Sequence, residues 1–219
     1  MTDDSRLFDR MAGELGSSLV SDVLDDLGHR RHHLAADLRS TSPDTVLVGR
    51  ANPWVVEEVD APPDEPYGGE IDALDSIRPD EVVLVAAGGT TRAALWGELF
   101  STAARTRGAR GVVIDGPVRD WRLIAEMGHP LFARGTLSLD AGGRTSVRGH
   151  HRRAVVCGLP VEAGDVVVAD VDGIVVIPAD LLDETVSRAF DKLAKESGVR
   201  ELIAGGATVR EAYDKYGVL

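Results

Sequence analysis

Residues 81–135 decide the fold class, because their apolar runs alternate between strand and helix patterns. The segment is EVVLVAAGGTTRAALWGELFSTAARTRGARGVVIDGPVRDWRLIAEMGHPLFARG. Its short runs rich in valine predict strands, and the stretches between them, with apolar residues at helical spacing, predict helices. The helices are expected over 92–108 and 119–128, each ending at a glycine. The pattern is a β-α-β-α-β unit, whose right-handed crossovers make the three strands parallel.

The flanking sequence predicts helices at both ends and a β-rich layer after this unit. We expect a single domain over 1–219, with an α/β fold. Residues 45–59, TVLVGRANPWVVEEV, predict one or two strands, with Pro53 interrupting the pairing. Asp172-Gly173 between two valine-rich runs predicts a hairpin. The remaining expectations are an N-terminal helical arm over about 1–30, a loop at 60–70 (DAPPDEPYGGE) and a C-terminal helical tail over about 180–219.

Composition and charge exclude several classes of function. The chain has 24 Lys and Arg against 36 Asp and Glu, a net charge of −12, which argues against general binding to nucleic acid. Cys157 is the only cysteine, so no intrachain disulfide forms. The polar start, MTDDSRLFDR, is not typical of a signal peptide, and no apolar run is long enough to span a bilayer. We therefore expect a cytoplasmic protein that acts without a membrane.

Three polar features follow the predicted parallel strands at the edge where ligands usually bind. They are the Gly88–Thr91 turn, Glu98 early in the first helix, and the pair Arg119-Asp120 after the next strand. Two carboxylates with room for waters are typical of a Mg²⁺ or Mn²⁺ site, and a guanidinium beside them binds a carboxylate. The pattern favours a 2-oxo acid ligand. The alternative from residue types alone is an ordinary charged turn with Glu98 as a solvated helix residue.

Two segments, ALWGELFSTAARTRGARGVVIDGPVRD (94–120) and HPLFARG (129–135), resemble the core motif of the RraA-like superfamily. The similarity extends to VSDVLDDLG (20–28) and GDVVVADVDGIVVIP (164–178). The superfamily includes class II pyruvate aldolases that act on 4-hydroxy-4-methyl-2-oxoglutarate and 4-carboxy-4-hydroxy-2-oxoadipate. The resemblance implies a three-layer β/β/α domain of the swivelling type. It also implies a homo-oligomer, a trimer or hexamer, with sites between subunits.

The resemblance also implies roles for individual residues. Asp120 would ligate Mg²⁺ or Mn²⁺ directly, and Arg119 would contact the pyruvyl group and its enolate. Glu98 would lie in the outer shell of the metal; the aldolases usually carry Asp there, so this side chain is one methylene longer. Glu196 is the best match for an acid that reaches the outer shell from a neighbouring subunit. The amides that resemble the carboxylate-binding loop of the family belong to Gly97, Glu98 and Leu99.

Taken together, the resemblance implies a metal-dependent lyase. It would release pyruvate from a 4-hydroxy-2-oxo diacid by retro-aldol cleavage, with oxaloacetate decarboxylation as a side activity through the same enolate. The alternative is a non-catalytic, RraA-like protein that binds and regulates an RNase. Some members of that branch lack the final acid of the Arg-Asp pair, so the presence of Asp120 favours the enzyme.

Two histidine-rich stretches and the cysteine need simpler explanations. His29–His33 (HRRHH) and 149–153 (GHHRR) lack the spacing of zinc ligands, so we expect solvated basic loops. Cys157 stands in an apolar run and is expected to be a buried small hydrophobe. Trp96 and Trp121 flank the predicted site residues, and we expect both to pack in the core.

Overall fold

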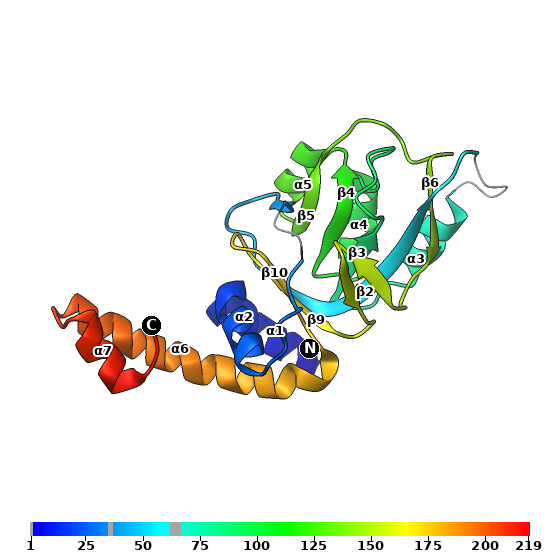
Figure 1. The fold of residues 1–219 in the computed structure, drawn as a ribbon. Helices are drawn as coiled ribbons and strands as arrows, with labels where there is room; N and C mark the ends of the chain where they lie inside the picture. The colour runs from blue at the N-terminus through cyan, green and yellow to red at the C-terminus, as the bar shows by residue number, and fades with distance from the viewer. Residues whose placement is uncertain (1, 35–36, 62–66) are drawn as a thin grey trace.

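A computed structural model describes residues 2–34, 37–61 and 67–219 as a mixed α/β fold (Figure 1). Its main sheet has the order β1-β5-β4-β3-β2-β9-β10, with β6 also pairing with β2. Strands β2 to β5 are parallel neighbours, which confirms the predicted unit and adds β2 to it. The strands of this sheet are β1 (Arg39–Ser40), β2 (Leu47–Glu58), β3 (Glu81–Ala86), β4 (Gly111–Val118), β5 (Leu131–Thr136), β6 (Thr145–Gly149), β9 (Val166–Ala169) and β10 (Ile174–Ile177).

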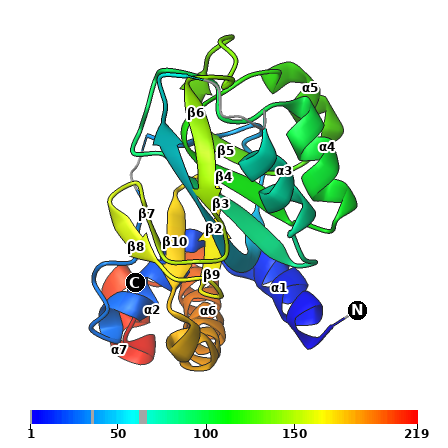
Figure 2. The same ribbon diagram turned by 90° about the vertical axis from the view of Figure 1, so that its right-hand side faces the viewer.

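Helices of the α/β unit cover one face of the parallel strands. They are α3 (Gly68–Asp75), α4 (Glu98–Thr106) and α5 (Trp121–Met127). Figure 2 shows all three on the same side of β2 to β5. Alternate residues of β3 point to opposite faces, so Val83 packs under these helices while Val82 and Leu84 pack on the other face. All six residues of β3 are buried, as is typical of a strand inside a parallel sheet.

The β-rich layer covers the opposite face of the parallel strands, and it completes a three-layer arrangement. It contains the predicted hairpin β9–β10, which turns at Asp172-Gly173, and a small hairpin of β7 (Ala154–Val156) and β8 (Leu159–Val161). Val167 and Val176 of the first hairpin pack against the parallel strands. The predicted α/β class with terminal helices is therefore confirmed.

Terminal helices close the outer face of the β9–β10 hairpin. They are α1 (Asp3–Glu14), α2 (Ser17–Asp26) and α6 (Leu182–Ala204), which follows the short 3₁₀ turn η1 (Ala179–Leu181). Val166 and Val168 of β9 pack against these helices in a third core. The hairpin is thus buried on both faces.

The last part of α6 extends beyond the body of the protein, and α7 (Val209–Tyr216) folds back on it (Figure 1). None of the helices in the described part of the chain combines the length and apolar character that crossing a bilayer requires.

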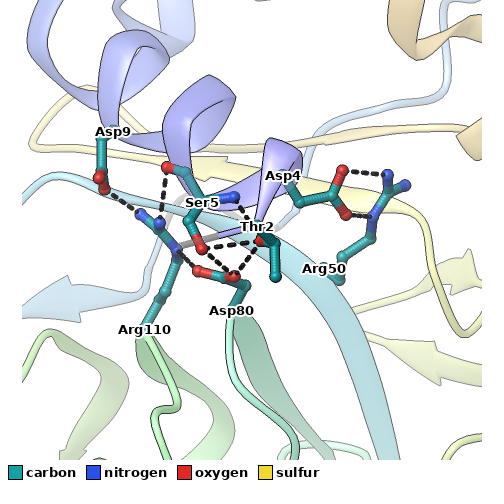
Figure 3. Close-up of polar contacts among 7 residues, drawn as sticks. All are labelled: Thr2, Asp4, Ser5, Asp9, Arg50, Asp80 and Arg110. Carbon is teal, nitrogen blue, oxygen red and sulfur yellow. Dashed lines mark hydrogen bonds and ion pairs between the residues drawn. The ribbon is translucent and has the colours of Figure 1, made fainter.

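Polar contacts fasten α1 to the loops beneath the sheet (Figure 3). Arg110, just before β4, donates from Nε to Asp80 Oδ1 at 2.8 Å and from Nη1 to Asp9 Oδ1 at 2.9 Å. The Ser5 hydroxyl donates to the other oxygen of Asp80. Burial raises the pKa of Asp80, but hydrogen bonds from Ser5, Arg110 and Thr2 outweigh burial and lower it. The carboxylate therefore stays ionised and holds the helix in place.

The prediction that Pro53 interrupts strand pairing is wrong for the edge of β2 that pairs with β3, and it holds for the opposite edge. β2 runs through it without a break, and Pro53 lies opposite Leu84 in the parallel register with β3. On the other edge of β2, β9 pairs only up to Arg50 and β6 begins at Val55. Proline costs a strand little where its missing N–H faces a gap in the ladder.

The loop predicted at 60–70 is only partly tested. Residues 62–66 lie outside the described part of the chain. Residues 68–70 already belong to α3, so the loop ends earlier than expected. Glu70 is buried and accepts a hydrogen bond from the Val147 amide of β6 at 3.1 Å. This contact fastens the start of α3 to the sheet.

The expectation of a solvated basic loop at His29–His33 is wrong for His32. His32 is buried; its Nε2 lies 2.8 Å from Ser21 Oγ, and its other ring nitrogen lies 2.5 Å from the carbonyl oxygen of His29. Cys157, which the sequence predicts to be buried, is half-buried at the turn between β7 and β8. Burial raises the pKa of its thiol to about 12.

Candidate active site

Helix α4 begins at Glu98, six residues later than the sequence pattern predicts. The segment before it is extended and buried, and its backbone bonds to neighbouring loops and to the end of β4 instead of forming a helix. Leu95 N donates to Pro117 O at 2.9 Å, and Arg119 N donates to Trp96 O at 2.9 Å. These bonds join the segment to β4, so Gly97 lies directly beside the Arg119-Asp120 pair.

Asp120 follows β4 and has a left-handed backbone, with φ of 58°. Asp120 is the N-cap residue of α5, but its side chain makes no capping hydrogen bond. Its carboxylate turns toward α4 instead. Asp120 Oδ2 accepts a hydrogen bond from Glu98 N at 3.2 Å and lies 3.8 Å from Arg119 Nε. Both side chains of the pair are about four-tenths exposed, 43% for Arg119 and 40% for Asp120, so a ligand can reach them.

The juxtaposition predicted from the spacing of 98, 119 and 120 is therefore present, although the roles of these residues stay predictions. The Glu98 carboxylate does not face Asp120; its Oε1 accepts a hydrogen bond from Thr102 Oγ1 of the same helix at 2.7 Å. It is the amide of Glu98, and not its carboxylate, that touches Asp120 in this structure.

Sequence reasoning missed Asp140 and Tyr67, which complete the polar part of the site. Arg119 Nη1 donates to Asp140 Oδ1 at 2.8 Å, and Tyr67 Oη donates to Asp140 Oδ2 at 2.9 Å. The Gly142 amide also donates to this carboxylate. Its hydrogen bond, with those from Tyr67 and Arg119, outweighs the effect of burial, so the pKa of Asp140 is lowered. The hydrogen bond that the Tyr67 hydroxyl donates to Asp140, together with burial, raises the pKa of Tyr67.

A cavity of about 390 Å³ opens at these residues. Trp96 lines it but is almost fully buried, with its Nε1 donating to Ser101 Oγ at 2.9 Å, so it is a core residue as expected. Trp121 packs against the same core and does not line the cavity. The lining consists of Tyr67, Ile71, Ala94, Leu95, Trp96, Gly97, Leu99, Phe100, Arg119, Asp120, Asp140 and Ala141.

Two residues or turns predicted near the site lie elsewhere. The Gly88–Thr91 turn follows β3 but does not line the cavity; Thr90 donates to Glu58, and Gly89 lies near the Arg134 side chain. Glu196 is in α6, which lies away from α4 and α5 in both ribbon views (Figures 1 and 2). Within one chain Glu196 therefore does not reach the cavity, and its role across subunits stays a prediction.

The donor set at the cavity fits a hard divalent cation held mainly by water. No group of three His, Cys, Asp or Glu side chains in the described ranges could hold a metal ion. Mg²⁺, however, commonly binds one or two carboxylates and keeps several waters or substrate oxygens. Asp120 offers one accessible carboxylate at the cavity, and its Arg neighbour offers positive charge to a substrate anion. Asp120 is thus the residue that would hold the ion.

Comparisons with known proteins place the chain in a family. Residues 17–176 match the RraA-like family, described as Aldolase/RraA. This match covers most of the chain, and the protein belongs to the RraA-like family.

Individual relatives agree with this assignment. The chain is 27% identical over 198 residues to a Halalkalibacterium halodurans protein named "Putative 4-hydroxy-4-methyl-2-oxoglutarate aldolase", covering 90% of this chain and 89% of the relative. It is 37% identical over 130 residues to an uncharacterized protein of Methanocaldococcus jannaschii, a match that spans 59% of this chain and 62% of the relative.

Among solved structures, Streptomyces coelicolor RraAS2 superposes with a TM-score of 0.80 at 24% identity, over 91% of this chain and 98% of that one. That protein is described as an unusual member of the RNase ES inhibitor RraA protein family. This likeness shows the fold.

Proposed function

We propose that the protein is a divalent-metal-dependent aldolase that cleaves a 4-hydroxy-2-oxo acid and releases pyruvate. The observation that carries the proposal is the placement of Arg119 and Asp120 beside Gly97 and the first turn of α4, at the mouth of a cavity in an RraA-like fold. The aldolase name of a relative that spans nearly the whole chain supports it.

The reaction needs the 4-hydroxyl to lose a proton and the C3–C4 bond to break. The electron pair of that bond forms the enolate of pyruvate, C4 becomes a carbonyl, and the enolate takes a proton at C3. A Mg²⁺ or Mn²⁺ ion held by Asp120 would supply the Lewis acid that polarises the 2-oxo group. Decarboxylation of oxaloacetate yields the same enolate, so we propose it as a side activity.

The protein's own residues bind the acid and stabilise charge. Arg119 uses Nη1 for Asp140 and keeps Nε near Asp120; within the described ranges, Nη2 donates to no protein group. The two N–H groups of Nη2 would donate to the pyruvyl carboxylate and to the oxygen that becomes the enolate oxygen. The amide of Leu99, in the first turn of α4, has no intrahelical acceptor and supplements them.

The first experiment measures pyruvate release, coupled to NADH consumption, from 4-hydroxy-2-oxo acids and from oxaloacetate with Mg²⁺, with Mn²⁺ and with EDTA. We expect turnover that EDTA abolishes. Arg119→Ala and Asp120→Ala should each lose nearly all turnover, and Asp120→Ala should also lose the response to metal. Arg122→Ala is the matched control, since this exposed neighbour on α5 pairs only with Glu126 in the described structure. Full activity in the Asp120 or Arg119 variant would overturn the site.

The competing function, a non-catalytic regulator of an RNase, has no specific observation in its favour here. RraAS2 shares the fold, and a fold does not define an activity. Binding of an RNase at micromolar affinity by a protein that releases no pyruvate would reverse our preference.

A further inference from the structure

The charged groups of the cavity are mostly acidic. Three ionisable side chains with charge at neutral pH line it, namely Arg119, Asp120 and Asp140, so among the protein's own side chains one cation faces two anions. The guanidinium lies between the two carboxylates, with Nε 3.8 Å from Asp120 Oδ2 and Nη1 2.8 Å from Asp140 Oδ1. A substrate whose pyruvyl group lies at Arg119 and Asp120 would therefore extend its remaining atoms toward Asp140 or along the apolar side chains of the lining, such as Ile71.

Two other arginines, Arg92 and Arg144, are close to the lining residues in the sequence but do not line the cavity. Arg92 donates to Asp60 at 3.0 Å and to Glu58 at 3.3 Å. Arg144, four residues after Asp140, directs Nη1 to the main-chain oxygen of Asp140 at 2.9 Å. The described residues 67–77, which border the cavity through Tyr67 and Ile71, include neither Lys nor Arg. A second carboxylate on the substrate would thus find no cationic side chain besides Arg119 in the described lining of the cavity.

Asp140 is held as an anion in the lining of the cavity. Its carboxylate accepts hydrogen bonds from the Tyr67 hydroxyl, the Gly142 amide and Arg119. Donors on both oxygens favour the charged form. Two like charges that share a partly enclosed site repel, and this repulsion weakens the binding of a dianionic substrate.

Apart from the charged groups and Tyr67, the cavity lining is mostly apolar. Ile71 of α3 is 51% exposed and Leu99 of α4 is 75% exposed, and Phe100 lies beside Leu99 in the lining. A methyl or longer alkyl group on the substrate would remove part of this surface from water, and apolar burial of that kind is favourable.

We infer that the cavity selects a 2-oxo monoacid with an apolar group at C4, and that Asp140 is the residue that disfavours a diacid. The inference rests on the proposed aldolase function and differs from the diacid that the family resemblance implies. The same repulsion should make oxaloacetate, also a dianion, a poorer substrate than the apolar monoacid.

The experiment compares two acids that differ in one group. 4-Hydroxy-4-methyl-2-oxopentanoate carries a methyl group where 4-hydroxy-4-methyl-2-oxoglutarate carries a carboxylate. The first yields one pyruvate and acetone per turnover, and the second yields two pyruvates, so rates are expressed per substrate consumed. We expect kcat/KM for the monoacid to exceed that for the diacid at least about tenfold, equivalent to about 1.4 kcal/mol.

Variants test whether Asp140 sets this ratio. Asp140→Asn should narrow the ratio, and Ile71→Arg, which adds a cation to the apolar wall, should shift it toward the diacid. Asp72→Asn makes the same chemical change as Asp140→Asn on α3, outside the lining, and should leave the ratio unchanged. Thermal unfolding confirms that each variant is folded.

The possible failures are distinguishable. A wild-type preference for the diacid, with metal-dependent turnover, would overturn this inference and leave the proposed function standing. A monoacid preference that is unchanged in both the Asp140 and Ile71 variants would remove Asp140 as its cause. No pyruvate from either acid, or from oxaloacetate, would overturn the proposed function and this inference together.

Discussion

A methyl group at Gly97 tests whether the position of the Asp120 carboxylate governs turnover. A Cβ at Gly97 would lie 2.8 Å from Asp120 Oδ2 and 3.3 Å from Arg119 Cγ. In Gly97→Ala the carboxylate must retreat by roughly 0.6 Å to reach the 3.4 Å at which ordinary contact begins. The backbone adds no strain, because φ of −152° and ψ of −175° are extended values that alanine adopts freely.

The displacement should affect catalysis more than folding. A misplacement of about 1 Å in a catalytic group can cost about 100-fold in rate, so the smaller shift here should lower kcat/KM by about 10- to 100-fold. That corresponds to about 1.4 to 2.7 kcal/mol of transition-state stabilisation. The free energy of unfolding should fall by less than about 1 kcal/mol, because the displaced atom is the tip of a partly exposed side chain.

The assay is pyruvate release with Mg²⁺ present, together with a thermal unfolding curve. Gly13→Ala is the control, because a Cβ at Gly13 on α1 meets nothing within 4 Å. It should keep full activity and unfold at the same or a slightly higher temperature, since alanine favours a helix over glycine. Near-wild-type turnover in Gly97→Ala would refute the reasoning that the carboxylate must occupy its present place.

Two further predictions concern stability. Arg110→Ala should lower the free energy of unfolding by about 2 kcal/mol, because it leaves Asp80 charged and partly buried, whereas Arg122→Ala should change little; unfolding in urea measures both. Burial, then the charge of Arg105, lowers the pKa of His129 from 6.5 to about 4. Between pH 6.5 and 4 the unfolded chain therefore binds more protons than the folded protein, so the free energy of unfolding should fall by up to about 3 kcal/mol over this range. In His129→Gln the free energy of unfolding should depend less on pH between 6.5 and 4. An unchanged dependence would contradict the assignment of this effect to His129.

Much of the fold could be predicted, because periodic apolar runs reflect which residues are buried. The strands at 81–86, 111–118 and 131–136 and the hairpin at 172–173 follow directly from such runs. The start of α4 did not, because residues 93–96 are apolar in a way that suits a helix or an extended buried segment equally. Only their bonds to the end of β4 select the extended form. The effect of Pro53 could be predicted on only one edge of β2 for a similar reason, since the tolerance of proline in a strand depends on where the neighbouring strands end.

The candidate site divides in the same way. One helix and one strand separate 98 from 119, and this regular interval predicts that both lie at one edge of the sheet. Tyr67 and Asp140 come from irregular segments, and nothing in the local sequence shows that they meet. Their pairing depends on how α3 and the loop after β5 pack, which is a property of the folded chain. Glu196 belongs to a helix that leads away from the cavity, so its role depends on a second subunit.

Strand β2 connects the two halves of the sheet, the parallel strands on one side and the antiparallel strands on the other. One of its edges pairs with β3, and the other pairs with β9 near its start and β6 near its end. Removing the β-rich half would strip the strand that supports the parallel half, and the reverse is also true. The protein should therefore melt in one cooperative transition, and a split of the chain into two fragments would leave one of them without its central scaffold strand.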